Sequence, residues 1–136
     1  MGWAMDASLA LAWTLPDERS GVADRFFRLL TADEVRVPAL FWYEITSAVT
    51  ASVRRGRMTP ASGERVLHLV SQLPIKTDAG VGQTCITPIG AVAREQGISA
   101  YDAAYLELAM RLGLGMATLD DRLGEAARRL GVPVFE

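Results

Sequence analysis

The sequence of 136 residues has few of the side chains on which most metal and covalent chemistry depends. It contains one cysteine, Cys85, which excludes an intrachain disulfide and favours a reducing, cytoplasmic setting. Its one histidine, His68, argues against a histidine-based zinc site and against a histidine-containing triad. We therefore expect both residues to be structural, and any reaction chemistry to rest on other groups.

Long apolar runs and an excess of basic residues are also missing. No stretch approaches the ~20 apolar residues of a membrane span, and the segment before Asp6 is too short for a secretion signal. The net charge is −2, so composition alone indicates no nucleic-acid partner, although a bound metal would offset the acidity. Half of the residues are hydrophobic and 22% are charged, which fits one globular domain over residues 1–136.

Short apolar segments alternate with helical segments along the chain. The expected strands are residues 3–5, 35–37, 74–76, 115–118 and 132–135, and the expected helices are residues 6–13, 19–30, 39–55, 60–73, 84–96, 99–112 and 120–130. This alternation predicts a parallel sheet with helices on both faces and ligands at the carboxyl ends of its strands.

Two aspartates stand where such a sheet would present them to a ligand. Asp6 ends the first expected strand, and Asp120 follows the fourth, just before a helix. Each also has the position of a helix N-cap, which is a purely structural alternative. The neighbouring Asp121 is better explained as a solvated acid that the helix dipole favours.

Two further acids lie within expected helices. Glu44 borders the apolar stripe of its helix, and its alternative role is an edge residue whose stem covers apolar surface. Asp102 lies ~140° around its helix from Glu107 and ~180° from Arg111, the two residues that we take to mark the solvent face. The alternative for Asp102 is a place in the first turn of a helix capped by Ser99, in a pattern that resembles a capping box.

Convergence of these helix and strand ends would place several carboxylates in one cleft. Like charges at short range raise one another's pKa values unless a cation lies between them. Oxygen ligands without histidine or cysteine select hard ions such as Mg²⁺ or Mn²⁺. Taken together, the four acids favour a metal site over four unrelated structural roles.

Four motifs spaced along the chain carry these acids. They read D-A-S-L-A-L-A-W, P-A-L-F-W-Y-E, G-I-S-A-Y-D-A-A-Y-L-E-L-A and M-A-T-L-D-D-R-L. In this order and spacing they resemble the PIN-domain ribonucleases, above all the toxin subunits of bacterial VapBC toxin–antitoxin systems. The resemblance implies a three-layer α/β/α fold with a central parallel sheet of about five strands. It also implies an Mg²⁺-dependent endoribonuclease, with Mn²⁺ as a substitute, that hydrolyses RNA phosphodiester bonds with metal-activated water.

The resemblance assigns the catalytic and metal-binding roles to Asp6, Glu44, Asp102 and Asp120. The three aspartates would be the main ligands, and the glutamate would bind through water or orient the nucleophile. The T-x-D form of the last motif selects Asp120 over Asp121. Ser8 and Thr118 match hydroxyl positions that support the metal site. Ser47 stands where the family often has asparagine, and its shorter reach would alter that support.

The resemblance also implies an RNA substrate, a cognate antitoxin protein, a homodimer and no membrane association. Arg54, Arg55 and Arg57 form a basic cluster suited to RNA phosphates, with a solvated helix end as the alternative. The consecutive aromatic residues 41–43 cannot all face one core, so at least one is expected at an interface or a groove wall.

Two other functions compete with the ribonuclease. A receiver-like phosphoacceptor domain also uses an aspartate cluster with Mg²⁺ on a parallel sheet. That class needs a lysine near the end of its last strand, whereas the only lysine here, Lys76, falls at the third expected strand. The other competitor is a catalytically inactive PIN-like binding module whose acids only cap helices.

Overall fold

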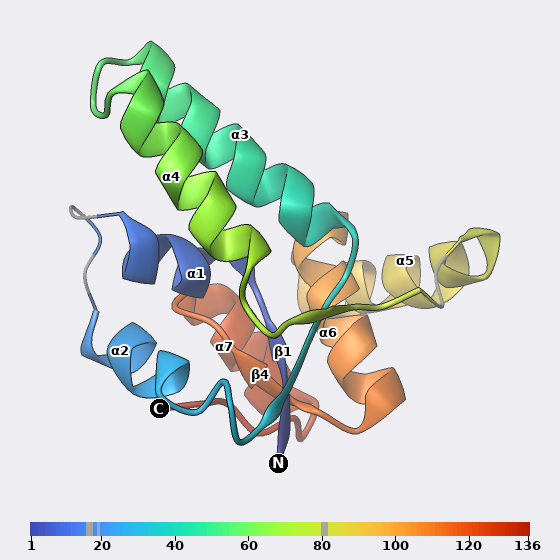
Figure 1. Cartoon of the computed structure of the whole chain (residues 1–136). Helices are drawn as coiled ribbons and strands as arrows, with labels where there is room; N and C mark the ends of the chain where they lie inside the picture. The colour runs from blue at the N-terminus through green and yellow to red at the C-terminus, as the bar shows by residue number, and fades with distance from the viewer. Residues whose placement is uncertain (16–17, 19, 80–81) are drawn as a thin grey trace.

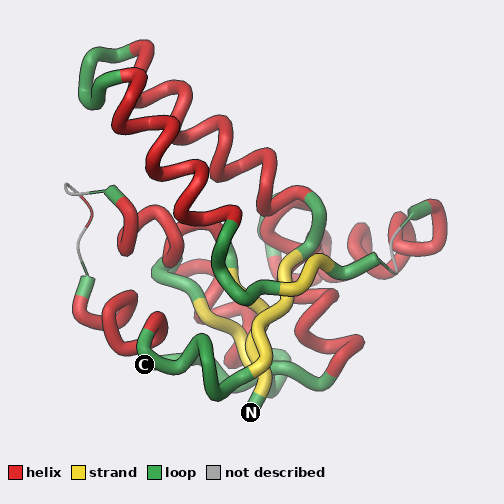
Figure 2. Tube along the Cα trace, viewed as in Figure 1, coloured by secondary structure: helices red, strands yellow, loops and turns green. Residues whose placement is uncertain are grey.

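A computed structural model describes residues 1–15, 18, 20–79 and 82–136, and its centre is a sheet with helices around it (Figures 1 and 2). The strands are β1 (Gly2–Met5), β2 (Glu34–Val37), β3 (Lys76–Thr77) and β4 (Gly115–Ala117), in the spatial order β3-β2-β1-β4. Trp3 of β1 pairs with Val35 on one side and with Gly115 on the other. The strand β1 is therefore central, and the end of β1 lies beside the end of β4.

Helices cover both faces of this sheet, which confirms the expected three-layer α/β/α architecture. They are α1 (Ala7–Thr14), α2 (Gly21–Phe27), α3 (Leu40–Arg54), α4 (Pro60–Ser71), α5 (Ile86–Gln96), α6 (Ala100–Leu112) and α7 (Asp121–Arg129), with a 3₁₀ turn η2 (Gln83–Cys85) before α5. Right-handed crossovers place the first four helices on one face and the last three on the other. Contacts of α1 with α2 and α3, and of α6 with α5 and α7, agree with this division.

Side-chain caps define where several of these helices begin. Thr59 caps α4 and Ser99 caps α6, and Pro60 takes the first position of α4, where its missing N–H is not needed. Pro88 lies in the first turn of α5 for the same reason, so the 84–96 segment starts as a 3₁₀ turn and continues as a helix. The expected 19–30 helix is shorter in the structure, as α2, and Arg19 lies outside the described residues.

The central strand and the helices around it form the core. Ala4 and Met5 of β1 are fully buried, and Phe41 and Ile45 of α3 pack toward them from one side. On the other side of the sheet, α6 presents the alternating small and large residues of its buried face, including Leu106 and Ala109. Small alanines let this helix lie close to the strands, which keeps the first turn of α6 near the sheet's carboxyl edge.

The last expected strand, residues 132–135, is reduced to an isolated parallel bridge between Met116 and Val134. Met116 N–H donates to the carbonyl of Pro133, and Phe135 N–H donates to the carbonyl of Met116. Because Pro133 has no N–H, the ladder cannot extend through it, and the sheet has four strands where about five were expected. The third strand likewise begins at Lys76, after Pro74, and not at residue 74.

The side of α6 that we took as its solvent face is partly buried, so that expectation is wrong. Glu107 is only 7% exposed, and it accepts a hydrogen bond of 2.8 Å from Nε of Arg111. The same guanidinium pairs with Asp78, a buried carboxylate just after β3. Because Arg111 neutralises two buried acids, this polar side of the helix packs under the chain that follows β3.

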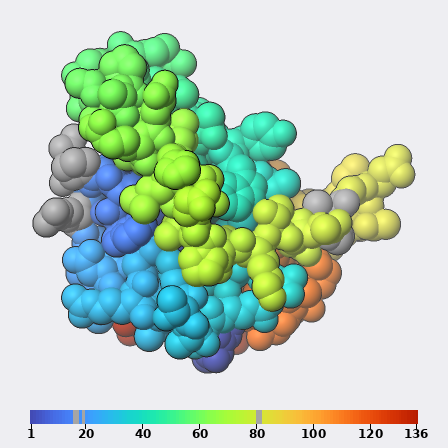
Figure 3. Space-filling model, in the orientation of Figure 1, coloured from blue at the N-terminus to red at the C-terminus, as the bar shows by residue number. Residues whose placement is uncertain are grey.

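The outline of the molecule is uneven. The helices α3 and α4 project together from the body, and α5 extends from another side, as the space-filling view shows (Figure 3). None of the residues of α5 is buried. Across the part of the chain that is described, no helix combines the length and the apolar character needed to cross a membrane.

Candidate acidic site

The carboxyl ends of β1 and β4 open into a cavity of about 450 Å³ that brings the four predicted acids together. Its polar lining residues are Asp6, Ser8, Glu44, Ser47, Asp102 and Asp120, and its apolar wall comes from α1 and α3. The acids come from four different elements, namely the end of β1, the third helix, the start of α6 and the turn after β4. Helices on opposite faces of the sheet therefore meet over one edge of it.

Asp6 is the most buried of the four acids, with 6% of its surface exposed. Its Oδ1 accepts hydrogen bonds from the Ser8 hydroxyl at 2.6 Å and from Leu9 N–H at 3.4 Å, and its Oδ2 accepts one from the Thr118 hydroxyl at 2.7 Å. Burial raises the pKa of Asp6 from 3.8 to about 6, against the lowering effect of these hydrogen bonds. Asp6 is thus both the N-cap of α1 and a carboxylate held at the cavity.

The hydroxyls of Ser8 and Thr118 each have a fixed direction. Ser8 Oγ accepts a hydrogen bond of 3.0 Å from Leu119 N–H, and Thr118 Oγ1 accepts one of 3.0 Å from Asp120 N–H. With those acceptor positions used, each hydroxyl gives its single proton to Asp6. These two side chains therefore hold the carboxylate of Asp6 in place relative to the backbone that carries Asp120.

Asp102 and Asp120 lie at the starts of α6 and α7. Asp120 is the N-cap of α7, and its Oδ1 accepts from Leu123 N–H at 3.1 Å. The N–H of Asp102 donates to Ser99 Oγ at 3.1 Å, so Ser99 is the cap and the carboxylate of Asp102 lines the cavity. Burial raises the pKa of Asp102, and the negative charge of Asp120 adds to the rise. The structural and ligand roles of these acids are therefore compatible.

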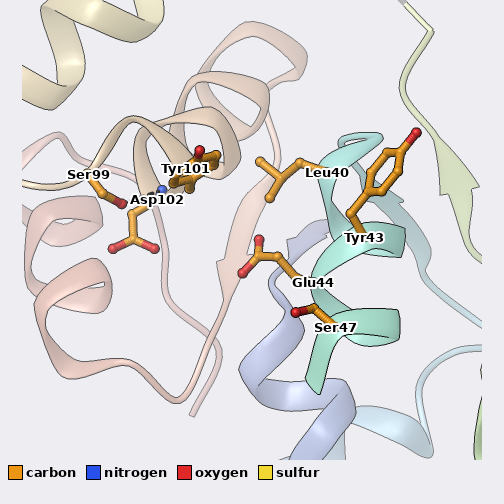
Figure 4. Close-up of a pocket in the computed structure, with 7 residues that line it drawn as sticks. All are labelled: Leu40, Tyr43, Glu44, Ser47, Ser99, Tyr101 and Asp102. Atoms are coloured by element: carbon orange, nitrogen blue, oxygen red, sulfur yellow. Dashed lines mark hydrogen bonds between the residues drawn. The ribbon is translucent and has the colours of Figure 1, made fainter. Parts of the chain in front are cut away.

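Glu44 extends from α3 into the same cavity, and Figure 4 shows its carboxylate and the side chain of Ser47 on one side of the helix. Its Oε1 accepts a hydrogen bond of 2.7 Å from the hydroxyl of Tyr105, a residue that is 1% exposed. Burial raises the pKa of Glu44, the bond from Tyr105 lowers it, and the charge of Asp102 raises it. Ser47 follows Glu44 by nearly one turn and faces the same space.

Tyr105 is the site residue that the sequence reasoning missed. It follows Asp102 by three positions, which places both side chains on neighbouring parts of one helix face. A buried tyrosine in a helix rich in alanine and leucine needs a partner for its hydroxyl, and that need was the available signal. The partner itself, Glu44, lies 61 residues away in the sequence.

The donor set of the cavity consists of carboxylate and hydroxyl oxygens. In the placement seen here, the described residues include no group of three acids, histidines or cysteines gathered closely enough to hold a metal ion. The chemistry of the oxygen donors still fits a hard divalent cation. Burial is the main cause of the raised pKa values of Asp6, Glu44 and Asp102, and the charge of a neighbouring carboxylate adds to each rise. A bound cation would relieve that repulsion.

The other predicted functional residues lie outside this cavity. Asp121 is exposed in the first turn of α7. Arg54, Arg55 and Arg57 are exposed at the end of α3 and in the turn that follows, beyond the lining residues of the cavity. Lys76 is exposed on β3 and pairs with Glu34 on the neighbouring strand, which leaves the receiver-like alternative without a lysine at the acids.

The three consecutive aromatic residues separate as their spacing requires. Phe41 is fully buried in the core, and Trp42 donates from Nε1 to Thr77 Oγ1 at 2.8 Å. Tyr43 is 77% exposed and lies on the wall of a second cavity beside the acids. The expectation that at least one of them lies at a groove wall is confirmed.

Comparison with known families places this chain in a defined class. The PIN domain family model matches residues 4–129. Ribonuclease VapC3 of Pyrobaculum aerophilum is 32% identical over 137 residues, which cover 98% of this chain and 100% of the relative. Ribonuclease VapC9 of Mycobacterium tuberculosis is 33% identical over 124 residues, or 91% of this chain and 90% of the relative. The chain therefore belongs to the PIN-domain family and, within that family, to the VapC ribonucleases.

Solved structures of similar proteins share the fold along nearly the whole chain. The crystal structure of PAE2754 from Pyrobaculum aerophilum matches with a TM-score of 0.75 at 23% identity, covering 99% of this chain and 90% of that one. VapBC2 from Rickettsia felis, solved with a DNA fragment of its promoter, matches with a TM-score of 0.70 at 10% identity, covering 98% and 97%. At these identities the likeness shows the fold alone.

Proposed function

We propose that this protein is a Mg²⁺-dependent endoribonuclease that acts as the toxin of a toxin–antitoxin pair. The observation that carries the proposal is the convergence of Asp6, Glu44, Asp102 and Asp120 on one cavity at the carboxyl edge of the sheet. Relatives that are at least 32% identical along nearly the whole chain are named as ribonucleases, which supports RNA as the substrate.

Asp6, Asp102 and Asp120 would hold Mg²⁺, or Mn²⁺ in its place, and Glu44 would bind through water or orient the attacking water. The bound ion would supply the Lewis-acid chemistry that activates water and stabilises negative charge on a phosphate. Ser8 and Thr118 keep the Asp6 carboxylate an acceptor with a fixed orientation. Phosphodiester hydrolysis of this kind needs no protein nucleophile, which agrees with a cavity lined by acids and serines.

The same proposal includes the partners implied by the family. Structural neighbours named as VapBC complexes support a cognate antitoxin as partner of this chain. A homodimer fits the surface of α5, which buries none of its residues in the monomer and exposes Ile86 to 71%. A cytoplasmic setting, expected from the single cysteine, belongs to this proposal as well.

An RNA cleavage assay with the Asp102→Asn protein tests the proposal. We expect the wild type to cut RNA in Mg²⁺ and to stop in EDTA, and the variant to lose cleavage while keeping its thermal unfolding transition. The exposed Asp121→Asn variant is the matched control and should cleave like the wild type. Cleavage that survives EDTA would contradict the metal-dependent mechanism.

Calorimetric titration with Mn²⁺ separates the enzyme from an inactive binding module. We expect the wild type to bind the ion and Asp6→Asn to bind it far more weakly, because the most buried of the four carboxylates is lost. Absence of binding to the wild type would favour a module whose acids only cap helices. Mapping of cleavage ends in total cellular RNA, with Asp6→Asn as control, would then identify the substrate.

A further inference from the structure

A second cavity, of about 540 Å³, opens directly beside the acids. It shares Glu44, Ser47 and Asp102 with the acidic cavity, and its remaining walls come from the starts of α3 and α6. Those walls are formed by Leu40, Tyr43, Ser99 and Tyr101. A ligand bound over Glu44 and Asp102 would therefore lie next to this second cavity.

The walls of the second cavity are apolar and aromatic. Tyr101 is 70% exposed and Tyr43 is 77% exposed, although large aromatic side chains usually lose most of their exposed surface in a folded domain. Figure 4 shows Leu40 extending from α3 toward α6, where Tyr101 lies, whereas the ring of Tyr43 turns outward. Leu40 and Tyr101 thus face a common space, and Tyr43 stands at its rim.

The two carboxylates in its lining, Glu44 and Asp102, restrict what this space can bind. A phosphate group would be repelled by Glu44 and Asp102, whereas a nucleobase is flat, aromatic and uncharged. The volume of the second cavity lies within the range of small-ligand sites, which is about 300–1,000 Å³. A base inside a paired duplex cannot enter a side cavity, so the occupant must be unpaired.

We propose that this cavity is a nucleobase subsite, in which the base next to the cleaved phosphodiester stacks on Tyr101 and packs against Leu40. The inference rests on the proposed ribonuclease function, because it needs an RNA strand lying over the acids. Stacking on an aromatic side chain holds a base without reading its identity, while the hydroxyl of Ser47 can bond to a polar edge. The subsite would therefore set which nucleotide lies at the acids, and so where the strand is cut.

Single abasic substitutions in a short oligoribonucleotide test the subsite. The substrate is one that the wild type cleaves at a mapped bond, and each member of the series lacks the base at one position around that bond. For the wild type, we expect removal of the base at one position next to the cleaved bond to lower kcat/KM by about tenfold. In Tyr101→Ala and Leu40→Ala the intact substrate should be cut about tenfold more slowly, and removal of that base should cost little more.

Two controls separate stacking from general damage. Tyr101→Phe keeps the ring and should keep the wild-type pattern. Leu69→Ala removes an apolar side chain that is 45% exposed on α4, away from this cavity, and should also leave the pattern unchanged.

If each base removal changes kcat/KM equally in the wild type, Tyr101→Ala and Leu40→Ala, the subsite is overturned. The proposed ribonuclease function still stands in that case, because the protein cleaves RNA. The same pattern combined with a change in self-association, or in antitoxin affinity, would assign the cavity to a protein partner instead. A wild type that cuts no RNA at all would overturn the proposed function and this inference with it.

Discussion

The hydroxyl of Tyr105 donates a hydrogen bond of 2.7 Å to Oε1 of Glu44, which joins α6 to α3 across the acidic cavity. Burial, followed by the bond to Glu44, holds the pKa of Tyr105 well above its usual value, so the phenol stays a proton donor. The bond therefore fixes one oxygen of Glu44 and leaves the other for the cavity. Tyr105 is a positioning residue that acts through Glu44.

We expect Tyr105→Phe to lower kcat by about tenfold, which corresponds to one lost hydrogen bond to a charged group. The buried ring is kept, so KM for RNA and the unfolding temperature should change little. Without this bond the pKa of Glu44 rises further, and the acid limb of the pH–rate profile should move to higher pH. Tyr43→Phe, at an exposed tyrosine, is the control; an unchanged pH profile in Tyr105→Phe would contradict the positioning role.

The buried Asp6 predicts how the stability of the metal-free protein depends on pH. Its pKa is about 6 in the folded state against 3.8 for the free side chain, so the folded state binds the extra proton between these values. Stability should therefore fall as pH rises from about 4 to about 6, by about 3 kcal/mol from this group alone. Urea unfolding in EDTA at several pH values measures the fall.

Asp6→Asn is the comparison that isolates this contribution. We expect its unfolding free energy to lack the part of the pH dependence that Asp6 supplies, and Mg²⁺ at pH 7 to stabilise the wild type but not the variant. If the difference in unfolding free energy between the wild type and Asp6→Asn stays constant between pH 4 and 7, Asp6 is not a buried acid with a raised pKa.

Arg111 lies between two buried carboxylates, and we expect its removal to be costly. Arg111→Ala leaves Asp78 and Glu107 without the cation that pairs with both, which should lower the free energy of unfolding by about 3 kcal/mol. Chemical denaturation checks this value, with Arg94→Ala at an exposed position of α5 as the matched control. A loss no larger than that of the control would show that the burial of the two acids does not depend on Arg111.

The order of elements and the place of the acids could be read from the sequence, because periodicity, caps and strand ends are local signals. Asp6 follows β1 as predicted, and Ser99 caps α6 as the alternative for Asp102 had it. The bond between Tyr105 and Glu44 could not be predicted, because it depends on how two helices from opposite faces of the sheet meet. Glu107 looked solvated for the same reason: it is buried beside Arg111, which pairs with Asp78 in the chain that follows a distant strand.

The basic cluster at the end of α3 lies on the same helix as residues of the acidic cavity. Ala51 lines the acidic cavity, and Arg54 and Arg55 follow it by three and four positions, so the same helix side continues from the acids toward both arginines. From Glu44 to Arg54 the helix rises about 15 Å, a distance that an RNA strand lying over the acids would reach within a few nucleotides. We therefore expect these side chains to contact phosphates on one side of the cleaved bond.

Replacing Arg54 and Arg55 together by glutamine should weaken RNA binding and reduce its salt dependence. For single strands each lost phosphate contact lowers the slope of log K against log salt by about 0.7, so the pair should lower it by about 1.4. Binding of an oligoribonucleotide to the Asp102→Asn background, measured from low to high salt, gives the slope without cleavage. Arg65→Gln and Arg94→Gln, combined in one protein, change the net charge equally on α4 and α5. An equal loss of slope in that control would mean that the effect is one of overall charge and that α3 does not guide the strand.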